Sequence, residues 1–296
     1  MKILILGKGY VGTALAECLS KCYNVTHICK SELDYTDRAQ LFMHLTKTNE
    51  AKYEFVINTC GYTGRPNVDA CEDNIQDTWH YNVVVPVNIQ KACKDSGVKL
   101  IHVSSGCIYD GYDKQYTEED EPNFGMLNPN SSWYSKTKHA CEMMLKDRDL
   151  YIFRVRMPFC NTWSERNILT KLIRYDSVIN CLNSVTNLED FCGFIMYFME
   201  DVLSQDNERI HPYGIYNVVN PEPITTADIL KILSDHGLGN DKWEHVELEE
   251  LYKNTKTQRS NCVLSDDKIR RIDLKLPTTV NSLVRCVQSM KQLASR

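Results

Sequence analysis

Residues 2–12 read KILILGKGYVG, an apolar run of strand length that leads into the glycine pattern G-x-G-x-x-G. A helical pattern follows it directly. In this strand–turn–helix context, Gly7, Gly9 and Gly12 permit a tight turn and a close approach of the backbone to a pyrophosphate, which the helix N-terminus stabilises. The stretch therefore predicts that the chain opens with a dinucleotide-binding unit.

Strand and helix patterns alternate through the first half of the chain. Apolar runs of strand length recur at residues 24–29, 55–58, 98–103 and 151–156. This alternation is typical of an α/β fold with a Rossmann-type doubly wound parallel sheet. The strict alternation fades beyond Pro158. We therefore expect residues 1–158 to form the NADP(H)-binding domain, and residues 159–296 to form a smaller C-terminal α/β substrate-binding part that exchanges segments with the first.

Local patterns place further elements outside these strands. Helices are expected at residues 167–175, 186–202, 225–238 and 282–293, the third capped by Thr225 or Thr226. The acidic, Pro- and Asn-rich stretch after Asp110 is expected to be a loop.

The residues after the second strand bear on the choice of cofactor. An NAD enzyme commonly places an acidic residue there to bind the ribose 2′-hydroxyl, whereas this chain has Lys30 and Ser31 before Glu32. A cation and a hydroxyl favour a 2′-phosphate, and hence NADPH. The alternative is that Glu32 binds the ribose and Lys30 is solvated, which would allow NADH.

Composition excludes several classes of partner. The formal net charge is −5 and no basic run is present, so neither nucleic acid nor an anionic membrane is expected to bind. No apolar segment approaches the length of a membrane span, and the opening residues run into glycines rather than a cleavage site. The chain is therefore expected to be cytoplasmic, in the host cytoplasm if its source is viral.

The thirteen cysteines include no C-x-x-C pair. An odd number without paired spacing argues against a disulfide framework and against a metal site. Most are predicted to be small buried apolar side chains, with Cys107 as the exception.

Two short segments bring catalytic side-chain types together. Ser105 is expected just past the end of the strand at residues 98–103, and Tyr134 and Lys138 are spaced i, i+4, which places them on one helix face. An ammonium near a phenol favours the phenolate and lowers the pKa of the phenol, while a hydroxyl at a strand end can hold a substrate oxygen. Such a trio can give a proton to a carbonyl that receives hydride. For an isolated match, a surface helix with one packed tyrosine is the alternative interpretation.

The glycine turn, Ser105 and the Tyr134-x-x-x-Lys138 pair, in that order, resemble the extended short-chain dehydrogenase/reductase family. More narrowly, the chain is similar to nucleotide-sugar reductases related to dTDP-4-dehydrorhamnose reductase. It is most similar to the plant-type bifunctional UDP-4-keto-6-deoxy-D-glucose 3,5-epimerase/4-reductases, which also occur in giant viruses. The matching segments span nearly the whole chain, at residues 61–72, 106–108, 122–124, 134–138, 154–158, 166–171 and 259–261.

The resemblance implies roles for individual residues. Tyr134 would protonate the C4 oxygen, Lys138 would lower the pKa of Tyr134 and bind the nicotinamide ribose, and Ser105 would hold the 4-keto oxygen. The implied cofactor-binding residues are Gly7, Gly9, Tyr10, Val11, Gly12, Lys30, Cys60 and Tyr62, together with Tyr134 and Lys138. The implied substrate-binding residues are Thr63, Arg65, Asn67, Met157, Asn167 and Arg259.

An epimerase also needs groups that exchange protons at C3 and C5, which the 4-ketone acidifies. A thiol suits this exchange near neutral pH, more so beside a cation. Cys107 stands where simple 4-reductases usually have tyrosine, and Lys171 stands where the related GDP-fucose synthases use histidine. The alternatives are that Cys107 is one more core residue and that Lys171 is a solvated helix charge.

The sequence thus favours an NADPH-dependent enzyme that epimerises UDP-4-keto-6-deoxy-D-glucose at C3 and C5 and reduces C4, giving UDP-L-rhamnose without a metal. The alternatives are a monofunctional 4-reductase of a dTDP- or UDP-sugar, and a non-catalytic, reductase-like regulatory subunit. The resemblance further implies a nucleotide-sugar substrate, a homodimer and a place downstream of a nucleotide-sugar 4,6-dehydratase. The sequence does not choose between uridine and thymidine.

Overall fold

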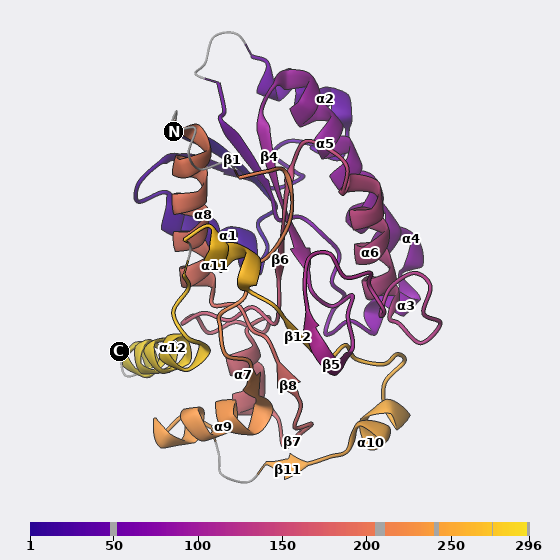
Figure 1. The fold of residues 1–296 in the computed structure, drawn as a ribbon, viewed down its shortest axis with the longest axis vertical. Helices are drawn as coiled ribbons and strands as arrows, with labels where there is room; N and C mark the ends of the chain where they lie inside the picture. Colours follow the sequence, from indigo (N-terminus) through magenta and orange to yellow (C-terminus); the bar gives the residue numbers. More distant parts are fainter. Residues whose placement is uncertain (48–51, 205–210, 240–242, 274, 295–296) are drawn as a thin grey trace.

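The computed structural model of the protein describes residues 1–47, 52–204, 211–239, 243–273 and 275–294. Its central element is a six-stranded parallel sheet in the order β2-β1-β3-β4-β6-β9 (Figure 1). The strands are β1 (Lys2–Leu6), β2 (Asn24–Ile28), β3 (Phe55–Asn58), β4 (Lys99–Ser105), β6 (Tyr151–Val155) and β9 (Gly214–Asn217). The winding reverses between β1 and β3, which forms a topological switch point, the place where doubly wound sheets bind ligands. The predicted fold class is confirmed.

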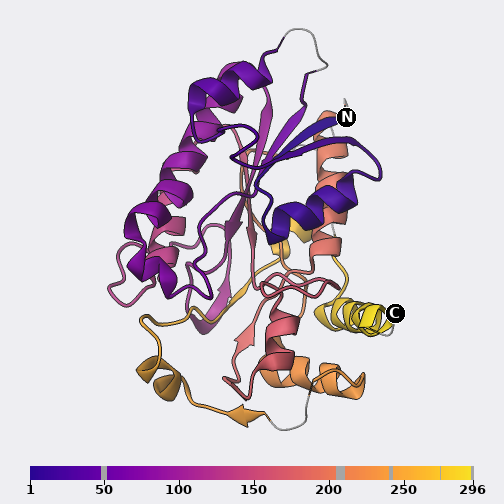
Figure 2. The same cartoon turned by 180° about the vertical axis from the view of Figure 1, so that it is seen from behind.

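Helices cover both faces of the sheet, as its strands require because they are buried on both sides. One face carries α1 (Tyr10–Leu19) and α8 (Leu188–Leu203), and the other carries α2 (Arg38–Leu45), α5 (Val85–Ser96) and α6 (Trp133–Leu145) (Figures 1 and 2). The sequence predicts that α2 ends near Asn49, which lies outside the described residues. Within the described ranges, no helix combines the length and apolar character needed to cross a membrane.

A π-helical turn interrupts the helix that leads into α5. The segment runs as α4 (Ile75–Trp79), the π-helical η1 (His80–Val84) and then α5. Single π-turns within helices frequently occur at functional sites. This one carries Asn82 toward the loop after β3.

Aromatic side chains fill the face of the sheet beneath α8. Phe153 of β6 packs edge-on against Phe191, Phe194 and Phe198 of α8, with ring centroids 5.0 to 6.3 Å apart. All four rings are buried. Helix α8 and strand β9 both come from beyond residue 158, so the second part of the chain completes the first sheet. The domain division at residue 158 itself stays a prediction.

The second part has a smaller apolar core of its own. It is built by α7 (Ile168–Arg174), α9 (Thr226–Asp235) and α12 (Thr279–Ala294), with side chains that include Leu172, Leu233 and Met290. Asn167 and Thr225 cap α7 and α9, the latter as predicted. The remaining elements are α3 (Ala70–Asp73), β7 (Ser177–Val178), β8 (Leu182–Asn183), β10 (Ile224–Thr225), β11 (Glu244–His245), α10 (Leu248–Lys253) and α11 (Asp267–Arg271).

The predicted loop after Asp110 is wrong in part, because it contains strand β5 (Gly111–Tyr116). β5 pairs in parallel with β12 (Cys262–Leu264). Four successive residues of β5 are exposed, so no alternation of apolar and polar residues marks it in the sequence. Its partner lies about 150 residues downstream, beyond the reach of any local pattern.

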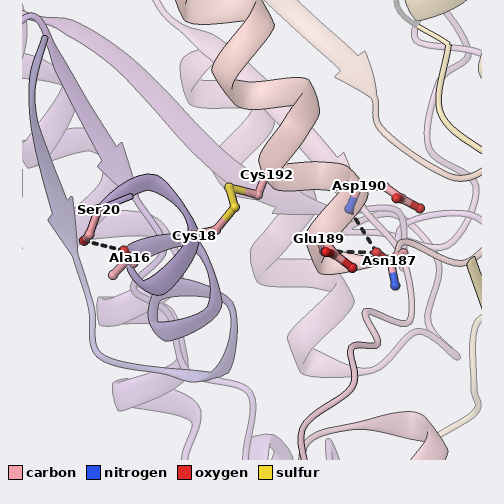
Figure 3. The surroundings of a disulfide bond; sticks show 7 residues. All are labelled: Ala16, Cys18, Ser20, Asn187, Glu189, Asp190 and Cys192. Carbon is pink, nitrogen blue, oxygen red and sulfur yellow. Dashed lines mark hydrogen bonds between the residues drawn. A yellow bond between two sulfur atoms is a disulfide. The ribbon is translucent and has the colours of Figure 1, made fainter. Parts of the chain in front are cut away.

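The argument against disulfides is also wrong for one pair. Cys18 of α1 is bonded to Cys192 of α8, and the two residues are 174 positions apart in the sequence (Figure 3). The packing of α1 against α8 brings them together, which cysteine spacing does not reveal. The other eleven cysteines are free.

Candidate active site

The glycine turn between β1 and α1 has the shape of a pyrophosphate cradle. Gly7 has φ of 101°, a conformation that favours glycine. A Cβ at Gly12 would lie 2.0 Å from the Gly7 carbonyl oxygen, so only glycine lets α1 approach β1 this closely. A Cβ at Gly9, the N-cap of α1, would meet nothing within 4 Å. The helix N-terminus therefore opens onto free space, which fits a bound pyrophosphate.

Tyr10 and Val11 begin α1 beside this cradle. The Tyr10 hydroxyl lies 3.2 Å from Cys160 Sγ, and both side chains pack against the core. What these residues can offer a pyrophosphate is therefore their backbone N–H groups. Cys60 is buried with its thiol on Asn58 Oδ1, and burial raises its pKa to about 12. Its backbone lies against Gly7.

The charged residues after β2 have distinct partners. Glu32 pairs with Lys8 at 2.7 Å and accepts a hydrogen bond from the Cys29 N–H, and these bonds lower its pKa to about 2. Lys30 is exposed, and its ammonium donates to the Tyr81 hydroxyl at 3.2 Å. The carboxylate of Glu32 is thus already paired with the ammonium of Lys8. Lys30, in contrast, forms no ion pair with a carboxylate among the described residues. This arrangement fits a 2′-phosphate better than a free 2′-hydroxyl.

The structure brings Ser105, Tyr134 and Lys138 together. Ser105 is the last residue of β4, and the side chain of Ser132 caps α6 just before Tyr134. The Ser105 hydroxyl lies close enough to the Tyr134 side chain to favour its anionic form, and Lys138 Nζ lies 5.9 Å from the Tyr134 ring centroid. All three side chains converge at the carboxyl edge of the sheet.

The predicted lowering of the Tyr134 pKa by Lys138 is not what the structure gives. Burial raises the pKa of Tyr134, the nearby Cys107 adds to the rise, and the Ser105 hydroxyl opposes it with a smaller effect. The reason is that the phenol is withdrawn from water, while the ammonium lies 5.9 Å from the centre of its ring. Tyr134 is therefore protonated at neutral pH, which is the form of a proton donor.

The loop after β3 is held against this trio by Asn82 of the π-helical turn. Asn82 accepts from the Tyr62 N–H at 2.7 Å and donates to the Tyr62 carbonyl at 2.9 Å and to Thr137 Oγ1 at 3.0 Å. A Cβ at Gly61 would lie 3.6 Å from Lys138 Nζ. The π-turn thus fixes the distance between the loop and α6. Sequence analysis did not identify Asn82 as a site residue.

Cys107 follows β4 and is partly exposed, unlike most cysteines of the chain. Its N–H donates to Ser105 Oγ at 3.3 Å, and Arg156 Nη1 donates to its sulfur at 3.4 Å. Sequence analysis missed Arg156 as a site residue, although it lies within the matching segment 154–158.

Lys171 lies half-buried on α7. Burial lowers its pKa, and the positive charge of Arg166 lowers it further. Arg166 also acts on Tyr134 and donates to the Gly64 carbonyl at 2.6 Å, so it links the segment before α7 to the loop after β3. Lys171 is therefore not an ordinary solvated helix charge.

The predicted substrate-binding residues come from several separate segments of the chain. Thr63, Arg65 and Asn67 are exposed on the loop after β3. Arg259 makes a two-point ion pair with Asp69, both N–O distances being 2.8 Å. The remaining two are Met157, which has φ of 39°, and Asn167, which is fully buried and donates to the Cys160 and Thr162 carbonyls. Within the described residues, no group of His, Cys, Asp and Glu side chains could hold a metal.

The family model described as the RmlD substrate binding domain matches residues 1–292. The chain is 31% identical over 295 residues to a bifunctional dTDP-4-dehydrorhamnose 3,5-epimerase/dTDP-4-dehydrorhamnose reductase from Arabidopsis thaliana, covering 96% of this chain and 91% of that protein.

A second plant relative is longer. A trifunctional UDP-glucose 4,6-dehydratase/UDP-4-keto-6-deoxy-D-glucose 3,5-epimerase/UDP-4-keto-L-rhamnose-reductase from Arabidopsis thaliana is 31% identical over 96% of this chain, which spans only 41% of that protein.

Solved structures share the fold. The UDP-rhamnose synthase of Acanthamoeba polyphaga mimivirus superposes with a TM-score of 0.86 at 23% identity, covering 98% of this chain and 99% of that one. A dTDP-4-dehydrorhamnose reductase from Bacillus anthracis, in complex with NADP, gives 0.79 at 21% identity, covering 96% and 97%.

Proposed function

The chain belongs to the RmlD substrate-binding-domain family, and we propose that it is an NADPH-dependent enzyme that epimerises UDP-4-keto-6-deoxy-D-glucose at C3 and C5 and reduces C4, giving UDP-L-rhamnose. The observation that carries the reductase half is the meeting of Ser105, Tyr134 and Lys138 beside an open glycine cradle.

The reductase residues would act as follows. Bound NADPH supplies the hydride for C4. Ser105 holds the 4-keto oxygen, and Tyr134 gives that oxygen a proton, which completes the alcohol. The Lys138 ammonium would bind the ribose next to the nicotinamide, and a proton from solvent would restore Tyr134. The backbone at Gly7 to Gly12 and the cation of Lys30 would hold the pyrophosphate and the 2′-phosphate. The NADP complex of the Bacillus anthracis reductase supports this choice of cofactor.

The epimerase half would use Cys107 and Lys171. The Cys107 thiolate removes a proton from C3 or C5, and the electron pair of the C–H bond is delocalised into the 4-ketone. The Lys171 ammonium then returns a proton to the opposite face, and exchange with water restores both groups, so the step is neutral overall. The half-buried state of Lys171 and the cation beside Cys107 support these roles. The plant relatives, whose names include a 3,5-epimerase, support them too.

We further infer that the substrate comes from a nucleotide-sugar 4,6-dehydration, because that reaction yields a 4-keto-6-deoxy sugar. The longer plant relative carries a 4,6-dehydratase in its name. The homodimer stays a prediction, and so does the cytoplasmic location.

The test is an assay with NADPH and UDP-4-keto-6-deoxy-D-glucose, in which NADPH absorbance is followed and the product is resolved by NMR. UDP-L-rhamnose is the expected product. Cys107→Ala and Lys171→Ala should each abolish epimerisation while leaving reduction of UDP-4-keto-L-rhamnose intact. A reduced sugar of D configuration would leave a 4-reductase only, and no NADPH oxidation with any 4-keto nucleotide sugar would favour the regulatory-subunit alternative.

A further inference from the structure

Arg156 is buried at the carboxyl end of β6, with its guanidinium directed at Cys107. It is 1% exposed, although arginine is rarely buried without a paired acid. Nη1 donates to Cys107 Sγ at 3.4 Å and to Ser260 Oγ at 3.1 Å. Nη2 donates to the Ser260 carbonyl at 2.7 Å and to Asn183 Oδ1. Within the described part of the chain, none of its hydrogen-bond partners is a carboxylate.

This arrangement is costly for a purely structural side chain. A buried cation needs a compensating negative charge, and an unpaired buried N–H is unfavourable. Arg156 Nε is buried without a hydrogen-bond partner among the described residues. Of the groups that the guanidinium hydrogen-bonds, only the Cys107 thiol can become an anion near neutral pH.

We propose that Arg156 is the positioning residue of the epimerisation step: its guanidinium donates to the Cys107 sulfur, directs that sulfur at the substrate carbon and stabilises the anionic form that takes up the substrate proton. This inference rests on the proposed epimerase function. Ser260, which precedes β12, and Asn183 of β8 fix the guanidinium from the second part of the chain. The direction of the sulfur is thereby linked to the part of the chain expected to bind substrate.

Among the described residues, Arg156 is connected to the reductase residues only through Cys107, whose N–H donates to Ser105 Oγ. Its side chain hydrogen-bonds neither Ser105, Tyr134 nor Lys138. Removing the guanidinium should therefore impair proton exchange and spare reduction. The ionisable groups that act on Cys107 or Arg156 from neighbouring elements are Tyr134, Cys262, Asp110 and Tyr112. None of these is changed in the test.

The test compares the full-length enzyme with Arg156→Met and Arg156→Lys. The first measurement is deuterium uptake at C3 and C5 of UDP-4-keto-6-deoxy-D-glucose in D2O. The second is reduction of UDP-4-keto-L-rhamnose by NADPH. The third is alkylation of Cys107 by iodoacetamide across a pH range, read by mass spectrometry of its peptide. The exposed thiol of Cys22 is the internal reference in the same samples.

Arg156→Met should lower deuterium uptake about 100-fold, the scale of one lost acid–base contribution, and leave reduction unchanged. Alkylation of Cys107 should slow and its pH profile should move to higher pH, because the thiolate is the reactive form. Arg156→Lys keeps the positive charge but loses the planar guanidinium with its paired N–H donors. Its deuterium uptake should therefore lie between those of the wild type and Arg156→Met. Equal uptake and equal alkylation in wild type and Arg156→Met would overturn the proposal.

Two further outcomes are distinguishable. If wild-type enzyme reduces but takes up no deuterium, the proposed epimerase function fails, whatever alkylation reports about the contact between Arg156 and Cys107. If Arg156→Met does not fold, Ser260→Ala replaces it, because it removes one anchor of the guanidinium. That variant should slow Cys107 alkylation relative to Cys22, and an unchanged ratio would overturn the proposal.

Discussion

Tyr134 is partly buried, and the withdrawal of its phenol from water outweighs the effect of Ser105 on its pKa. We predict that Tyr134→Phe lowers the rate of 4-keto reduction about 10²- to 10⁴-fold, because the carbonyl oxygen loses its acid. Because the pKa of Tyr134 is raised above the ordinary tyrosine value of about 10, the acid form persists through neutral pH. The pH–rate profile of reduction should therefore show no basic decline from Tyr134 below about pH 9. Tyr197→Phe, at an exposed tyrosine of α8, is the control.

Lys171 illustrates a residue whose function opposes stability. Burial and Arg166 lower its pKa, so the folded protein binds a proton at Lys171 less readily than the unfolded chain does. The ammonium therefore destabilises the fold below the pKa of the unfolded lysine, and this cost fades as pH rises. Lys171→Met should raise the melting temperature at neutral pH while it lowers deuterium uptake about 10²-fold or more. A lower melting temperature would contradict this assignment.

The site residues differ in how far the sequence alone predicts their contacts. Tyr134 and Lys138 are four positions apart on one helix, so their pairing is readable from local spacing. Arg156 reaches Cys107 across 49 positions and Ser260 across 104, so its role depends on how strands and loops meet in space. The raised pKa of Tyr134 was missed for the same reason, because burial is a property of the folded molecule.

At the scale of elements, a buried ion pair joins α6 to the sheet. Glu142 of α6 pairs with Arg154 of β6 at 2.7 Å, and the two side chains are 3% and 2% exposed. Ser104 of β4 donates to the same carboxylate. We predict that Glu142→Ala lowers the free energy of unfolding by about 3–5 kcal/mol, because Arg154 is left as a buried unpaired charge. Urea denaturation measures this change.

The matched control is an exposed pair of α9. Lys231 and Asp235 are 73% and 54% exposed, so Asp235→Ala should change the free energy of unfolding by less than about 1 kcal/mol. The double variant Glu142→Ala/Arg154→Met should recover part of the loss, because no buried charge remains. Equal effects of Glu142→Ala and Asp235→Ala would refute a structural role for the buried pair.

A covalent bond joins two further elements, α1 and α8. We predict that reduction of the Cys18–Cys192 disulfide lowers the free energy of unfolding by about 2–4 kcal/mol, because the unfolded chain regains freedom. Denaturant curves with and without dithiothreitol measure the change, and Cys22→Ser is the control at an exposed free thiol. Titration of thirteen thiols in denatured protein that has never met a reductant would show that the bond is absent in solution.

Across the whole molecule, the sequence predicts most strands of the central sheet but not every strand pairing. Apolar runs identified β1, β3, β4 and β6, since strands buried on both faces read as continuous hydrophobic stretches. Strand β5 was missed because it is polar and its partner β12 lies far along the chain. The position of β9 at the sheet edge, next to β6, is likewise a consequence of the complete fold.

That dependence gives a prediction about the two parts of the chain. Strand β9 pairs with β6, and three phenylalanines of α8 cover Phe153. A fragment of residues 1–158 would expose this apolar face and the edge of β6, so it should not unfold cooperatively and should aggregate. Addition of residues 159–296 should restore a cooperative transition, measured by near-UV circular dichroism during denaturation. A fragment 1–158 that unfolds cooperatively by itself would instead mean that the sheet needs neither β9 nor α8 to form its core.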